Sequence, residues 1–127
     1  MATILIIEDH EVALSLCKAM LGESHNIIEA KDTDSALKLL RMHKPELVIA
    51  DLMVPNSEGF FPTPSKAIEL ISHLRAINDK TKIVVYSVLC YEPEVSKQAF
   101  AFGANACLLK MGDVETFRKT INSLLSE

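Results

Sequence analysis

The fold is decided by the stretch TILIIED, residues 3–9, in which five β-branched or aliphatic residues run without alternation into two carboxylates. A continuous run of this kind is typical of a strand that is covered on both faces, as in a parallel sheet. The stretches LVIA at residues 47–50 and KIVVY at residues 82–86 have the same character. The sequence therefore predicts a parallel sheet, and two of its strands run directly into acidic residues.

Amphipathic patterns separate these strands and predict five helices. Their apolar positions lie in residues 12–21, 36–43, 68–77, 95–102 and 114–125, and Pro45 and Gly103 are stop signals after the second and fourth. Weaker strand patterns at residues 26–30 and 106–109 complete an order of strand then helix that repeats five times. Repeated right-handed crossovers of this kind build a doubly wound α/β sandwich. We expect a single domain over residues 1–127.

Composition excludes several classes of protein. A chain of 127 residues with 49% hydrophobic content can bury one sizeable core, and the net charge of -4 with 13 scattered basic residues disfavours direct nucleic-acid contact. The first apolar run is too short for a signal peptide or a membrane span, so we expect a cytoplasmic protein without membrane contact. The three cysteines form no CxxC pair, and we expect them to be reduced and mostly buried.

Ionisable and hydroxyl side chains fall where the predicted strands stop. Glu8 and Asp9 follow the first strand, Asp51 the third, Ser87 the fourth and Lys110 the fifth. The carboxyl ends of parallel strands meet at one edge of a sheet, which is where such folds bind ligands. Three carboxylates at that edge repel one another by up to about 4 kcal/mol per pair at ~4 Å with an effective dielectric near 20, which favours a bound cation.

Oxygen ligands on a hydrated edge suit Mg²⁺. With a metal, a hydroxyl and an ammonium group to share the charge of a phosphoryl group, one carboxylate can act as its nucleophile. Each residue also has an ordinary structural interpretation: Asp9 could cap the first helix, Asp51 could belong to a turn, Ser87 could be a cap and Lys110 a solvated charge. The convergence of four strand ends on one edge favours the functional interpretation.

Four segments together resemble the response-regulator receiver family, and the resemblance covers essentially the whole chain. These segments are ILIIEDH (residues 4–10), DLMVPNSEG (51–59), IVVYS (83–87) and GANACLLK (103–110). The resemblance implies a flavodoxin-like (βα)5 fold with sheet order 2-1-3-4-5. It also implies a phosphoacceptor switch rather than an enzyme, with Asp51 accepting a phosphoryl group from a sensor histidine kinase or a phosphotransfer protein.

The resemblance further implies roles for the other residues at the strand ends. Asp9, Asp51 and the backbone carbonyl of Met53 would ligate Mg²⁺, and Glu8 would act through water. Ser87 and Lys110 would bind the phosphoryl oxygens.

Phosphorylation would draw Ser87 inward and bias a population shift on the face formed by the fourth helix, fifth strand and fifth helix. The resemblance implies that an output domain or a downstream protein binds this face. The segments look most like receivers that precede helix-turn-helix output domains, which suggests transcription control as a context. The sequence also allows a homodimer.

Four departures from the family pattern affect what is expected. Cys107 occupies the switch position at which the family usually has Tyr or Phe. Met111 follows Lys110 where proline is common, so we expect a trans peptide bond there. Val88 is larger than the usual Ala or Gly and should slow the access of water to an aspartyl phosphate. Residues Phe60–Ser65 look like an insertion, and we expect an irregular loop whose aromatic side chains pack locally.

Three alternatives differ in the residues that they require. A haloacid-dehalogenase-like phosphatase needs a second acid two residues after the nucleophile, and that position holds Met53. A flavodoxin-like FMN module needs a first loop that attracts phosphate, whereas Glu8, Asp9 and Glu11 repel it. A receiver-fold interaction module, whose partner binding does not depend on phosphorylation, stays open because of Cys107 and the inserted loop.

Overall fold

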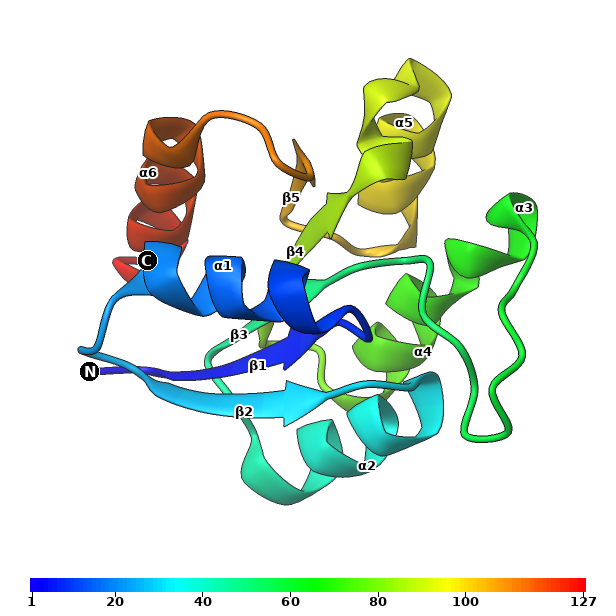
Figure 1. Ribbon diagram of the computed structural model, residues 1–127, viewed down its shortest axis with the longest axis horizontal. Coiled ribbons are helices and arrows are strands. Elements are labelled where there is room, and N and C mark those ends of the chain that lie inside the picture. Colours follow the sequence, from blue (N-terminus) through cyan, green and yellow to red (C-terminus); the bar gives the residue numbers. More distant parts are fainter.

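The protein is built on one five-stranded parallel sheet of order β2-β1-β3-β4-β5 (Figure 1). This computed structural model describes all 127 residues. The strands are β1 (Thr3–Ile7), β2 (Asn26–Ala30), β3 (Leu47–Ala50), β4 (Lys82–Ser87) and β5 (Ala106–Leu109). All neighbouring pairs are parallel, so the predicted strands, their direction and the order 2-1-3-4-5 are confirmed.

Helices cover both faces of the sheet. They are α1 (Glu11–Leu21), α2 (Thr33–His43), α3 (Pro64–Ala67), α4 (Glu69–Ile77), α5 (Pro93–Phe102) and α6 (Val114–Leu125), and a 3₁₀ turn, η1 (Val88–Tyr91), precedes α5. In Figure 1, α1 and α6 lie on one side of the sheet, where they contact each other, while α2 and α4 lie on the other. The α5 helix contacts α4 and so extends the second layer. No helix is both long enough and apolar enough to cross a membrane.

Alternate residues of each strand enter opposite cores. Leu5 and Ile7 belong to the larger core with residues of α2, α4 and α5, whereas Ile4 and Ile6 belong to a second core with residues of α1 and α6. A strand buried on both faces has no polar positions along its length, which explains the unbroken apolar runs of the sequence. In β1 and β3, polar side chains are therefore confined to the strand ends.

The segment before α4 differs from the prediction of an irregular loop through residue 65. Pro64 begins the short helix α3 because its fixed φ suits the first helical position, and α3 continues into α4 through Ile68. Local packing of the aromatic residues is also wrong, since Phe60 is 68% exposed and Phe61 54% exposed. Asn56 instead holds the loop: its side-chain oxygen accepts from the Glu58 and Phe60 N–H groups, both at 3.0 Å.

Candidate functional site at the carboxyl edge of the sheet

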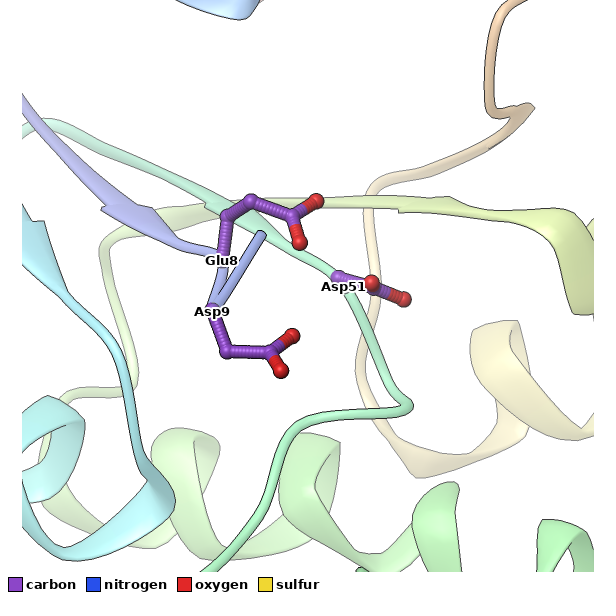
Figure 2. A group of neighbouring side chains, drawn as sticks. All are labelled: Glu8, Asp9 and Asp51. Atoms are coloured by element: carbon purple, nitrogen blue, oxygen red, sulfur yellow. The ribbon is translucent and has the colours of Figure 1, made fainter. Parts of the chain in front are cut away.

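The three acidic residues come together because β1 and β3 are neighbours and end level with each other. Ile7 lies opposite Ala50, and the Asp51 N–H donates to the Ile7 carbonyl at 3.0 Å, one residue beyond the paired strands. Figure 2 shows the side chains of Glu8, Asp9 and Asp51 turned toward the same space. One carboxylate oxygen from each residue lies within 4.8 Å of the others.

Lys110 brings the fifth strand end into this cluster. Its ammonium group forms ion pairs with Glu8 and with Asp51, the latter at 2.9 Å, and its side chain is only 12% exposed. The alternative interpretation of Lys110 as a solvated charge is therefore wrong. Three ionised carboxylates facing one ammonium group leave an excess of negative charge, so the site favours a further cation.

The three acidic residues of the cluster differ in how deeply they are buried. Glu8 is 4% and Asp51 6% exposed, whereas Asp9 is half-buried. Burial opposes the charged form of Lys110, but its hydrogen bonds and charge interactions with Glu8 and Asp51 outweigh burial and raise its pKa. Lys110 is therefore a cation at neutral pH.

Backbone hydrogen bonds orient the acidic side chains. The Met53 N–H donates to Asp51 Oδ1 at 3.2 Å, and the His10 N–H donates to Glu8 Oε2 at 3.1 Å. His10, not Asp9, caps α1, because its Nδ1 accepts from the Ala13 N–H at 3.4 Å. The interpretation of Asp9 as a helix cap is thus wrong, and its carboxylate is turned to the cluster instead.

Ser87 lies at the end of β4, next to the strand that carries Asp51. Its hydroxyl caps η1 by accepting from the Leu89 N–H at 3.2 Å, and its carbonyl accepts from the Lys110 N–H at 3.1 Å. Cys107 lies on β5 opposite Val85, and β5 packs against η1. Both predicted switch residues therefore contact η1.

The loop after Lys110 shows a contact that the sequence did not indicate. The chain has no cis peptide bond, as predicted for Lys110–Met111, but Met111 takes a left-handed conformation with φ of 65°. Its N–H donates to the hydroxyl of Tyr86 at 3.0 Å, and the Tyr86 ring packs against Phe117 with centroids 5.2 Å apart. In the sequence Tyr86 is simply an apolar strand residue, so nothing marked it as a partner of this loop.

A cavity of about 370 Å³ opens over the cluster. Its polar wall includes Asp51 and Lys110, and its apolar wall consists of exposed side chains that the sequence had not grouped: Val12, Leu16, Val88 and Met111. A larger cavity of about 730 Å³ between the end of α2, the start of β4 and the end of α6 contains none of the clustered residues. Of these two cavities only the smaller adjoins the acidic cluster and Lys110, and we take it as the candidate functional cavity.

Comparison with known proteins agrees with this fold and site. The model of the response regulator receiver domain family matches residues 4–122. Protein PilH of Pseudomonas aeruginosa is 30% identical over 128 residues, with 99% of both chains covered. The chain therefore belongs to the response regulator receiver domain family, whose members are phosphoacceptor signalling modules rather than enzymes in the usual sense.

Other relatives are longer than this chain. Fimbriae Z protein of Salmonella typhimurium is 25% identical over 98% of this chain, which spans 57% of that protein. Histidine kinase P4 of Formosa agariphila is 30% identical over 98% of this chain, which spans 8% of it. Among solved structures, the BeF3-activated N-terminal receiver domain of Klebsiella pneumoniae RstA has a TM-score of 0.83 at 22% identity, with 98% of this chain and 99% of that chain covered. That likeness shows the fold alone.

Proposed function

We propose that this receiver accepts a phosphoryl group on Asp51 from a sensor histidine kinase or a phosphotransfer protein, in a reaction that depends on Mg²⁺. The observation that carries the proposal is the placement of Asp51. Its carboxylate is buried, is paired with Lys110 at 2.9 Å, lies within 4.8 Å of two further acids and lines a cavity open to solvent. That the chain matches a segment of Histidine kinase P4 supports a phosphorelay context.

The residues present fit a magnesium ion. The donors at the site are carboxylate oxygens, and ligands of one Mg²⁺ ion lie at most ~4 Å apart, so a spacing within 4.8 Å needs only a small contraction. Asp9, Asp51 and the Met53 carbonyl would hold the ion, and Glu8 would act through water. When bound, the ion would neutralise part of the negative charge and polarise the phosphoryl oxygens.

The transfer itself needs a nucleophilic lone pair on an Asp51 oxygen and a counter-charge for the phosphoryl group. An Asp51 oxygen forms the new bond to phosphorus while the bond from phosphorus to the donor's imidazole nitrogen breaks and its electron pair stays on that nitrogen. Lys110 is placed to pair with a phosphoryl oxygen, because its ammonium group already contacts Asp51. Lys110 would give up its ion pair with Glu8 and pair with the phosphoryl oxygen instead.

The surface around the cavity supports a protein donor. Val12 and Leu16 on α1 and Met111 after β5 are exposed apolar side chains beside the acidic cluster. A small phosphodonor has no need of such a rim, whereas a helical donor protein could bury it while presenting its phosphorylated histidine to Asp51.

The outcome of phosphorylation would pass through Ser87 to α5. The Ser87 hydroxyl accepts from the Leu89 N–H, so a movement of this hydroxyl toward a phosphoryl oxygen would loosen the first turn of η1. Since η1 leads directly into α5, we infer a shift of the face formed by α5, β5 and α6, which an output domain or downstream protein would recognise. Exposed Phe100 and Phe102 give α5 apolar area for such a contact.

The proposal is tested by incubating the protein with Mg²⁺ and acetyl phosphate and measuring its mass. We expect the gain of one phosphoryl group, its loss in the presence of EDTA and its absence in Asp51→Asn. Asp79→Asn, an exposed acid outside the cluster, is the matched control and should gain the group normally. If the wild-type protein gains nothing, Asp51 is not a phosphoacceptor.

The second candidate is a receiver-fold interaction module whose partner binding is independent of phosphate. Two observations favour it: Cys107 replaces the usual aromatic switch residue, and Phe60 and Phe61 are exposed but do not line the cavity over the acidic cluster. Partner affinity measured with and without beryllofluoride separates the two functions. Equal affinity in both states would favour the module, and a difference would favour the phosphorylation switch.

A further inference from the structure

Two of the three cysteines meet where η1 contacts β5. Cys90 lies in η1 and Cys107 in β5, two elements that pack against each other, and both side chains are half-buried at the margin of the larger core. Each thiol shifts the pKa of the other. The expectation that the cysteines are mostly buried is correct only for Cys17, which lies in the core on the other face of the sheet. Chain spacing gave no sign of the pair, because it depends on how η1 folds back against β5.

The surroundings of the pair distinguish the two thiols. The hydrogen bond from Cys90, helped by one from Ser96 and opposed by burial, lowers the pKa of Cys107 to about 7. The same contact and burial raise the pKa of Cys90. Cys107 is therefore partly a thiolate at neutral pH, is accessible to solvent and lies next to a second cysteine, which is the arrangement found at oxidation-sensitive thiols.

We propose that Cys90 and Cys107 form a reversible disulfide when the protein meets a peroxide. The Cys107 thiolate attacks one peroxide oxygen, the O–O bond breaks, and the products are a sulfenic acid on Cys107 and one water once the leaving hydroxide takes up a proton. The Cys90 sulfur then attacks the Cys107 sulfur; the S–O bond breaks, and the Cys90 proton leaves with the hydroxide as a second water. Two thiols lose two electrons, which the peroxide takes up, and a thiol reductant reverses the step.

The cross-link would hold η1 against β5. Cys90 lies three residues after Ser87, the residue whose hydroxyl caps η1. If phosphorylation moves Ser87 and η1, the disulfide retains the arrangement that precedes this movement. Oxidation would then oppose the switch, and this second part of the inference rests on the proposed function.

The first test concerns the disulfide alone. The reduced protein is treated with an equimolar amount of hydrogen peroxide, and its intact mass and non-reduced peptide digest are measured. We expect the loss of two hydrogens, a peptide linking Cys90 to Cys107, and recovery of the thiols with dithiothreitol. Cys17→Ser should give the same product, whereas Cys90→Ser and Cys107→Ser should not. Cross-links through Cys17, covalent dimers, or oxidation of Cys107 without a link would each overturn the proposal.

The second test concerns the coupling to the switch. The rate of phosphoryl gain from acetyl phosphate is compared between reduced and oxidised protein, and we expect it to be several-fold lower after oxidation. Cys90→Ser should show no such difference between peroxide-treated and untreated samples. Equal rates in a protein shown to be cross-linked would overturn the coupling but not the disulfide. A reduced protein that gains no phosphoryl group would instead refute the proposed function, and the disulfide would be judged by the mass measurement.

Discussion

Lys110 is the one cation among three acids, and both of its ion-pair partners, Glu8 and Asp51, are buried. Removing it in Lys110→Met leaves Glu8 and Asp51 without a counter-charge. We expect the free energy of unfolding at neutral pH to fall by about 2 kcal/mol, less than the loss typical of a fully buried pair because water reaches part of the site. Urea unfolding measures the difference, with Lys119→Met on the exposed face of α6 as a control that should change little.

The pH dependence of this difference follows from the raised pKa of Lys110. A cation whose pKa is higher in the folded state stabilises the protein fully below its unfolded value of 10.5 and loses that contribution as the pH rises through the folded value. The gap between wild type and Lys110→Met should therefore be constant near neutrality and close only above about pH 10.5. A gap that closes between pH 7 and 9 would show that Lys110 is not held as described.

Val88 is the exposed residue after Ser87 and forms part of the cavity wall beside Asp51. Its two methyl groups restrict the approach of water to a phosphoryl group on that aspartate. In Val88→Ala we expect the aspartyl phosphate to hydrolyse several-fold faster, measured as the release of inorganic phosphate from the phosphorylated protein. Val114→Ala in α6, which is exposed but outside the cavity, is the matched control. An unchanged lifetime in Val88→Ala would mean that access is not what limits hydrolysis.

At the scale of elements, β4 and the loop after β5 are joined by the Tyr86 hydroxyl, which accepts from Met111 in its left-handed conformation. Tyr86→Phe keeps the ring against Phe117 but removes the acceptor. We expect a loss of about 1 kcal/mol in the free energy of unfolding. The rate of phosphoryl gain at Asp51 should fall as well, because Lys110 precedes the loosened residue.

A second variant separates strain from hydrogen bonding in that loop. Met111→Gly removes the side chain that disfavours a φ of 65°. Added to Tyr86→Phe in a double variant, it should recover part of the free energy of unfolding lost in Tyr86→Phe. Both effects are read from urea unfolding and from the acetyl phosphate assay. If Tyr86→Phe matches the wild type in both, the hydroxyl does not position Lys110.

The sequence correctly predicted the elements whose structure follows from one clear local pattern. Short unbroken apolar runs rich in β-branched residues are typical of strands with both faces covered. The carboxyl ends of neighbouring parallel strands share an edge, so the sequence alone groups Glu8, Asp9, Asp51 and Lys110. The loop before α4 was harder, because Pro64 breaks a helix from within but starts one at its first position. The Cys90–Cys107 and Tyr86–Met111 contacts depend on how loops fold back, which no local pattern records.

At the scale of the whole molecule, apolar cores cover both faces of the sheet, so charged side chains of the central strands lie at the sheet's edges. Because both faces of the sheet are sealed by helices, the carboxyl edge collects acids that folding brings close together, and their repulsion reduces stability. Folding and cation binding are therefore coupled: an ion that binds only the folded protein stabilises it by about 2.7 kcal/mol at a hundred times its dissociation constant.

We therefore expect the thermal unfolding midpoint to be higher in Mg²⁺ than in EDTA. The Asp9→Asn variant should differ from the wild type in both conditions. Without metal the variant should be more stable than the wild type, by on the order of 1 kcal/mol, because one of three crowded charges is gone. With Mg²⁺ it should gain little, because a ligand has been lost. Asp79→Asn should retain the full wild-type response. The Asp9→Asn protein could instead be no more stable than the wild type in EDTA and still respond fully to Mg²⁺. That outcome would mean that neither the ion nor the charge repulsion involves Asp9.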